Sequence, residues 1–166
     1  MNTTYNYEKD TLKYPFSGHT KVFENYSQAY QDLFVLSMLK GKKNGKYVEV
    51  GANHPQNMSN TFLLETIFGW RGFSIEIERA MCEVFNGDMA RQNHCYEADG
   101  TQFDYLEAIK KEGWQNRIDY LSLDCEPPNV TFDILKNSHF RYIFTYDVFR
   151  FIVTTFNYDI WINFFY

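Results

Sequence analysis

The stretch Tyr47–Asn53, with the sequence YVEVGAN, decides the fold of this chain. Tyr47, Val48 and Val50 carry the aromatic and β-branched side chains that favour a buried strand. Gly51 then permits a sharp turn and a close backbone approach by a ligand. A strand, a glycine loop and a following helix are typical of the nucleotide-type sites of open α/β sheets, although an ordinary strand-to-helix turn has the same pattern.

Helices and strands are predicted to alternate on both sides of this stretch. Further strands are predicted at residues 73–77, 92–98, 118–123 and 140–146. Helices are predicted to begin with Ser27, with Ser59, with Arg79, with Thr101 and Asp104 as a capping-box-like start, and with Asn129. Strands separated by helices of this size form βαβ units, so we expect an α/β fold with a mostly parallel sheet and helices on both faces.

The length of 166 residues predicts a single domain. We expect an irregular lead-in over residues 1–25, the main α/β unit over residues 26–147 and an aromatic-rich tail over residues 148–166. The sequence allows two structures for the tail. It could form a hairpin that turns at residues 157–159 and covers the sheet edge, or it could be a loosely packed segment that drives self-association. We expect the second, because no helix is predicted directly before the hairpin.

Composition and charge narrow the classes of function. A net charge of −5 without a long run of Lys or Arg argues against binding to nucleic acid or to an anionic membrane. No stretch is long and apolar enough for a transmembrane helix, and the N-terminus shows no apolar signal segment. The three cysteines form no Cys-x-x-Cys pair, which is typical of a reducing compartment. We therefore expect a cytoplasmic protein with no metal site.

Carboxyl side chains lie at or just beyond the ends of four successive predicted strands. They are Glu49, Glu76, Glu78, Glu97, Asp99, Asp124 and Glu126. Because the carboxyl ends of parallel strands converge on one crevice, we expect these acids to approach one another, although solvated loop acids would have the same pattern. Glu76 is well placed to accept hydrogen bonds from ribose hydroxyls, and Asp99 to meet an adenine amine.

Four segments, taken in order, resemble the FkbM-type methyltransferases, which use S-adenosyl-L-methionine. They read SQAYQDLFVLSML from Ser27, YVEVGANHP from Tyr47, SNTFLLETIFGWRGFSIEIE from Ser59 and IDYLSLDCE from Ile118. The resemblance covers about residues 22 to 147. It implies a Rossmann-like class I methyltransferase fold and methylation of a hydroxyl oxygen.

The resemblance also implies roles for individual residues. The implied cofactor-binding residues are Glu49, Gly51, Ala52, Asn53, Asn60, Glu76, Asp99 and Asp124, and the implied catalytic residues are Asp124 and Glu126. Glu49 and Pro55 stand where the family usually has aspartate and glycine, and Pro127 stands where it tends to have glycine. The resemblance fades beyond Asp147, so the C-terminal strands of the fold are expected to be incomplete.

The function expected from the sequence is thus methyl transfer from S-adenosyl-L-methionine to the oxygen of a small molecule or saccharide. The alternative is a non-catalytic, truncated methyltransferase-like domain that binds an adenosine ligand or a partner protein. An amino-methyltransferase is disfavoured, because the segment EPPN at residues 126–129 lacks the aromatic residue that stacks on a base. A dinucleotide oxidoreductase is disfavoured because GANHPQ lacks the second and third glycines of its motif. His54 is a further candidate base.

Overall fold

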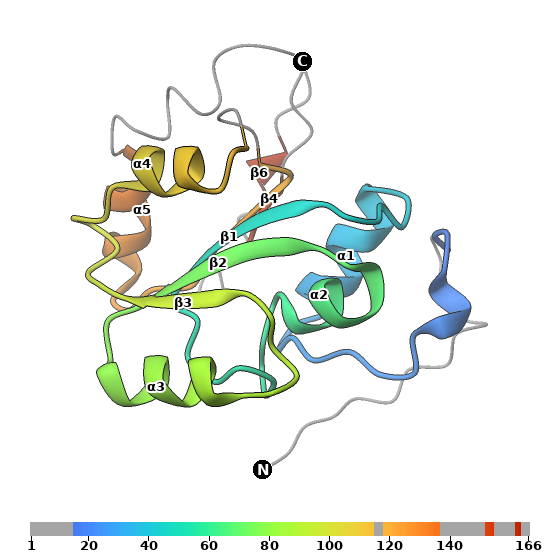
Figure 1. The fold of residues 1–166 in the computed structure, drawn as a ribbon. Coiled ribbons are helices and arrows are strands. Elements are labelled where there is room, and N and C mark those ends of the chain that lie inside the picture. The colour runs from blue at the N-terminus through green and yellow to red at the C-terminus, as the bar shows by residue number, and fades with distance from the viewer. Residues whose placement is uncertain (1–14, 115–117, 137–151, 155–161, 164–166) are drawn as a thin grey trace.

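The structure is a computed structural model that describes residues 15–114, 118–136, 152–154 and 162–163. Its helices are the 3-10 helix η2 (His19–Lys21), α1 (Gln31–Met38), α2 (Phe62–Phe68), α3 (Arg79–Gly87), α4 (Tyr105–Lys111) and α5 (Pro128–Lys136) (Figure 1). Its strands are β1 (Lys46–Val50), β2 (Arg71–Glu76), β3 (His94–Glu97), β4 (Tyr120–Leu123), β5 (Ile152–Thr154) and β6 (Ile162–Asn163). None of the helices in these segments has the length and apolar character needed to cross a membrane.

The strands form one sheet in the order β3-β2-β1-β4-β5-β6. Strands β1 to β5 pair in parallel, and β6 pairs antiparallel with β5. The strand order reverses at β1, because β2 and β3 lie on one side of it and β4 lies on the other. The predicted Rossmann-like α/β fold is therefore confirmed. In such sheets the ligand crevice forms where the order reverses, beyond the carboxyl ends of the strands.

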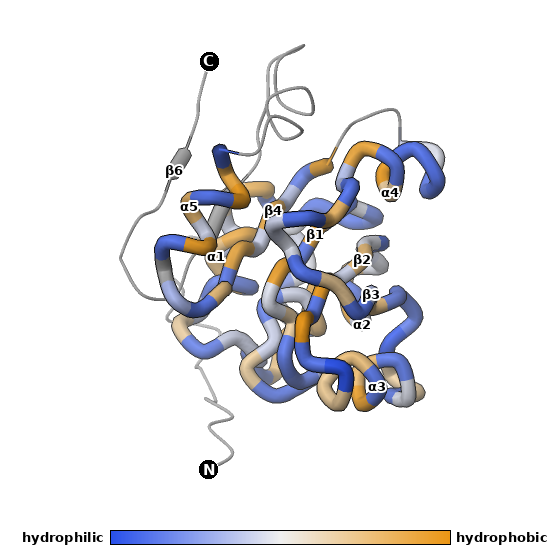
Figure 2. The backbone as a smooth tube through the Cα atoms, turned by 90° about the vertical axis from the view of Figure 1, so that its left-hand side faces the viewer, coloured by the Kyte–Doolittle hydropathy of each residue, from blue (hydrophilic) through white to orange (hydrophobic). Residues whose placement is uncertain are grey.

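Alternation along β1 divides the interior into two cores. Val48 and Val50 pack with residues of α4 and α5, whereas Tyr47 packs with residues of α1 and α2. Accordingly, α4 and α5 cover one face of the sheet, and α1, α2 and α3 cover the other (Figure 1). Hydrophobic and hydrophilic residues alternate along α4 and α5, as expected for helices with one buried face (Figure 2).

The predicted helix starts are confirmed at α4 and shifted at α1 and α2. Asp104 is the N-cap of α4, and its side chain accepts a hydrogen bond from the backbone N–H of Glu107 at 2.9 Å. Ser27 and Ser59 lie three and two residues before the N-cap positions of α1 and α2, but each hydroxyl accepts a hydrogen bond from a backbone N–H of the first turn, Asp32 N at 3.3 Å and Phe62 N at 3.1 Å. The Ser27 hydroxyl also donates to Asp32 Oδ1 at 2.7 Å, which ties the preceding loop to α1.

The chain on either side of the predicted α/β unit also contributes to the fold. Phe16 and Val22 are buried in the core beneath α1 and α2, so the described part of the predicted lead-in packs against the domain. In the tail, β5 pairs with β4 and β6 pairs with β5, which agrees with the hairpin alternative and contradicts the expected loose packing. The strand predicted at 140–146 and the turn predicted at 157–159 lie outside the described residues.

Candidate functional site

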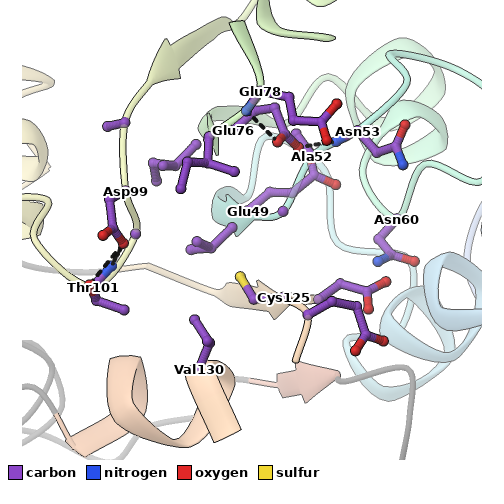
Figure 3. A pocket seen from close by; sticks show the side chains of 18 of the residues that line it. Glu49, Ala52, Asn53, Asn60, Glu76, Glu78, Asp99, Thr101, Cys125 and Val130 are labelled. Carbon is purple, nitrogen blue, oxygen red and sulfur yellow. Dashed lines mark hydrogen bonds between the residues drawn. The ribbon is translucent and has the colours of Figure 1, made fainter. Parts of the chain in front are cut away.

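A cavity of about 650 Å³ lies at the carboxyl ends of β1, β2, β3 and β4 (Figure 3). Strands β1 and β2 contribute their last residues and the loops that follow them to the lining, whereas β3 and β4 contribute only the loops that follow them. All of the predicted site residues line this cavity: Glu49, Gly51, Ala52, Asn53, Asn60, Glu76, Asp99, Asp124 and Glu126. The four strand ends therefore converge on one cavity, as the sequence predicts.

Gly51 packs the loop after β1 against the end of β4. Its φ is +81°, and a Cβ atom at this position would lie 2.1 Å from the carbonyl oxygen of Asp124. From the sequence we expected that a side chain here would block a ligand. The structure corrects that reason, because the side chain would collide with the backbone of the chain itself. Gly51 thus sets the distance between two loops that line the cavity.

The Glu76 carboxylate is held at the end of β2 by two backbone groups. Its Oε2 accepts a hydrogen bond from Asn53 N at 2.8 Å, and its Oε1 accepts one from Glu78 N at 2.9 Å (Figure 3). The residue is 8% exposed. Each carboxylate oxygen has a second lone pair, so both can accept a further hydrogen bond from a ligand. The fixed orientation suits Glu76 to the recognition of a pair of hydroxyl groups.

Glu49 belongs to a buried polar network on the α2 side of the cavity. Its Oε2 accepts hydrogen bonds from Ser74 Oγ at 2.7 Å and Thr61 Oγ1 at 3.0 Å, and it lies 3.9 Å from Arg91 Nη2. Burial raises the pKa of the Glu49 carboxyl group, and the Arg91 charge opposes that rise. Because its Oε2 already accepts two hydrogen bonds from the protein, Glu49 stabilises the cavity wall more than it provides an acceptor for a ligand.

Arg91 is the residue of this network that the sequence analysis missed. Its guanidinium donates to Thr61 Oγ1 at 2.9 Å and to Pro55 O at 3.3 Å, both in the segment between β1 and α2. It also lies 4.3 Å from the centroid of the Phe85 ring of α3. Arg91 follows α3 in a polar stretch, DMARQN, in which no local pattern marks it as buried.

Asp99 and Asn60 lie on opposite parts of the lining (Figure 3). Asp99 is exposed, and its Oδ1 accepts hydrogen bonds from the backbone and the hydroxyl of Thr101, both at 2.8 Å. Thr101 therefore closes a turn with Asp99 and does not cap α4. Asn60 is buried, and its Nδ2 donates to Ser122 Oγ of β4 at 3.0 Å. This bond ties the start of α2 to the strand that carries the predicted catalytic acids.

The loop after β4 places three polar side chains on the cavity. Asp124 is half-buried, Glu126 is exposed, and Cys125 lies between them. Burial raises the pKa of the Cys125 thiol to about 12, so the group is a neutral thiol at physiological pH. The sequence analysis did not include Cys125, although its place in LDCE could have identified it. His54 does not line the cavity, and its Nδ1 accepts hydrogen bonds from the backbone of Gln56 and Asn57.

The chemistry available at the cavity is that of carboxylates, amides and a thiol. Within residues 15–136 and the two short C-terminal strands, omitting 115–117, no group of three or more His, Cys, Asp or Glu could hold a metal ion. The lining can therefore bind an organic ligand through hydrogen bonds and charge, and its carboxylates can accept a proton. A scan against protein-family models and a search of curated proteins find no match for this chain.

Proposed function

We propose that this protein is an S-adenosyl-L-methionine-dependent methyltransferase of the FkbM type, which methylates a hydroxyl oxygen of a small molecule or saccharide. The observation that carries the proposal is the single cavity at which all of the residues implied by the resemblance meet. Side chains from positions between 49 and 126 of the chain meet there because β1 lies between β2 and β4 in the sheet, and the strand order reverses at β1. Such a position is the usual ligand site of this class of fold.

The lining fits an adenosyl ligand in size and in chemistry. A volume of about 650 Å³ lies within the usual range for small-molecule pockets. Glu76, at the end of β2, would accept hydrogen bonds from the ribose hydroxyls, and Asp99, at the end of β3, would accept one from the adenine amine. Gly51, Ala52 and Asn53 form the adjoining loop after β1.

The chemical step requires alignment and a proton acceptor. S-adenosyl-L-methionine, when bound, supplies a methyl group that its sulfonium centre has already activated. The residues of the cavity would position the acceptor hydroxyl for the displacement, in which a C–O bond forms as a C–S bond breaks. Asp124 or Glu126 would accept the hydroxyl proton, because both residues lie on the loop beyond β4 that lines the cavity.

Calorimetric titration with S-adenosylhomocysteine tests the proposal without knowledge of the acceptor. The wild-type chain is expected to bind it, and Glu76→Gln is expected to weaken binding by about 10- to 100-fold through loss of charge-assisted hydrogen bonds. Glu97→Gln is the matched control. Glu97 pairs in register with Glu76 across β2 and β3, but it is exposed and does not line the cavity.

Two results would contradict the proposal. One is the absence of any binding by folded wild-type protein, with folding verified by circular dichroism. The other is an equal effect of Glu76→Gln and Glu97→Gln. A second assay, the release of S-adenosylhomocysteine in the presence of a panel of polyols and sugars, separates a methyltransferase from a domain that only binds an adenosine ligand.

A further inference from the structure

The loop between β1 and α2 contributes Asn53, Met58 and Asn60 to the cavity lining. Asn53 and Met58 both lie in the left-handed backbone region, with φ values of 49° and 60°. Asparagine tolerates this region, but a methionine rarely adopts it, so the conformation of the loop persists only where surrounding contacts hold it. The shape of this side of the cavity therefore depends on the contacts that the loop makes.

The segment of residues 88–93, between α3 and β3, makes two of these contacts. Gln56 Nε2 donates a hydrogen bond to Oδ2 of Asp88, the C-cap residue of α3, at 2.6 Å. An ionised carboxylate only accepts hydrogen bonds, so this bond also fixes the orientation of the Gln56 amide. Arg91 donates to Pro55 O at 3.3 Å. Two adjacent residues of the loop are thus held by two residues of one segment.

The same segment is anchored to the rest of the fold. Asp88 Oδ1 accepts a hydrogen bond from Ala90 N at 2.8 Å, which closes the turn after α3. The backbone N–H groups of Gln92 and Asn93 both donate to Glu65 Oε1 of α2. These bonds lie outside the cavity lining, so the segment supports the loop whether or not a ligand is bound.

The loop in turn contacts the residue proposed to bind the ribose. Asn53 N donates to Glu76 Oε2 at 2.8 Å, and this bond sets the direction of the carboxylate. Gln56 and Asp88 are half-buried, and neither is part of the described cavity lining. Their hydrogen bond can therefore affect a ligand through the position of the loop, and not through direct contact.

We propose that Gln56 and Asp88 are positioning residues, which hold the loop between β1 and α2 in the conformation that binds the ligand. This inference rests on the proposed function, in which the ligand is an adenosyl compound. Without the bond, the loop occupies other conformations as well, and the apparent affinity falls in proportion to the fraction that remains competent to bind. A competent fraction of about one tenth would lower the affinity about tenfold.

The test is a calorimetric titration of the full chain and its variants with S-adenosylhomocysteine. Gln56→Glu places a carboxylate against Asp88 and is expected to weaken binding about tenfold. Asp88→Asn alone is expected to bind like wild type, because two amides can still pair. In the double variant, the new amide at position 88 can donate to the new carboxylate at position 56, so the wild-type affinity should return.

Two further measurements separate positioning from other effects. Asn57→Asp is the matched control for charge, because Asn57 is the next residue of the loop, is also half-buried, and has no side-chain hydrogen bond among the described residues. It should bind like wild type. Thermal unfolding without ligand should change little in all four variants, since the altered side chains are half-buried. Weaker binding with unchanged melting indicates positioning and not a loss of stability.

Each contrary result has a distinct meaning. Equal affinities of Gln56→Glu and Asn57→Asp, or a double variant that binds as weakly as Gln56→Glu, would overturn the positioning role and leave the proposed function standing. If Gln56→Glu does not fold, Gln56→Met removes the donor without adding charge, and wild-type affinity in that variant would overturn the role as well. If folded wild-type protein does not bind S-adenosylhomocysteine, the proposed function fails, and the positioning of an adenosyl ligand fails with it.

Discussion

The guanidinium Nε of Arg91 lies 3.1 Å from Glu65 Oε2, and both side chains are almost completely buried. Glu49 is the second carboxyl group of this network, 3.9 Å from Arg91 Nη2. A single arginine thus lies between a strand residue that lines the cavity and a residue of α2. The charges are far from water, so each depends on the others for compensation.

Replacement of Arg91 by Met should destabilise the protein by about 3–5 kcal/mol, because two buried carboxyl groups would lose their counter-charge. Methionine retains much of the apolar stem that packs near Phe85. The free energy of unfolding is measured by urea denaturation with circular dichroism. Arg79→Met is the matched control, since Arg79 forms an exposed pair with Glu83 at 2.8 Å.

The control is expected to leave the urea midpoint essentially unchanged, because exposed ion pairs contribute little. Equal midpoints for Arg91→Met and wild type would show that the network does not stabilise the fold. A fully unfolded Arg91→Met variant would agree with the prediction, and Arg91→Lys would then give a measurable intermediate, since lysine keeps the charge and loses the planar set of donors.

The Glu49 network should also make stability depend on pH. Burial raises the pKa of Glu49 above its ordinary value of 4.5, so the folded chain holds this proton more tightly than the unfolded chain. The stabilisation from this group is fully present below that value and is lost as the pH rises through the raised pKa. Wild type should therefore lose stability relative to Glu49→Gln as the pH increases above about 4.5. Urea denaturation over a pH series measures the difference, and a difference that stays constant or grows in favour of wild type would contradict the prediction.

Gly51→Ala should destabilise the fold and not merely the bound state. The variant puts a Cβ atom 2.1 Å from Asp124 O at a φ of +81°, and strain of this kind costs about 1–3 kcal/mol. Gly87→Ala is the control, because no atom lies within 4 Å of the Cβ it would introduce and φ is not positive. Thermal denaturation without ligand is the measurement. Unchanged melting of Gly51→Ala would show that the loops after β1 and β4 can separate freely.

Local signals in the sequence were sufficient for the central part of the fold. The apolar run at Val48 and Val50, and the strand and helix patterns that follow, predicted the parallel sheet because buried strands and amphipathic helices have short, regular periods. Topology then placed Glu76, Asp99 and Asp124 together, since the carboxyl ends of parallel strands converge. The roles proposed for these residues come from the family resemblance, and the structure adds that the residues line one cavity.

The features that the sequence did not predict depend on contacts between distant residues. Arg91 meets Glu49 across 42 positions of the chain (91 minus 49), and no periodic pattern reports such a pair. Ser27 lies four residues before α1, and its hydroxyl reaches the helix through both the side chain and the backbone N–H of Asp32, a pairing that local helix-capping rules do not predict. The tail differs for a similar reason: β5 pairs with β4, which precedes it by almost thirty residues (152 minus 123).

The most direct measurement is a crystal structure of the chain with S-adenosylhomocysteine. The account predicts the ligand in the cavity beyond β1 to β4, with its ribose hydroxyls within hydrogen-bond distance of the Glu76 carboxylate and its adenine amine beside Asp99. The thioether should lie toward the loop that carries Asp124 and Glu126. A ligand bound elsewhere, or in the cavity with its ribose away from Glu76, would contradict the central claim.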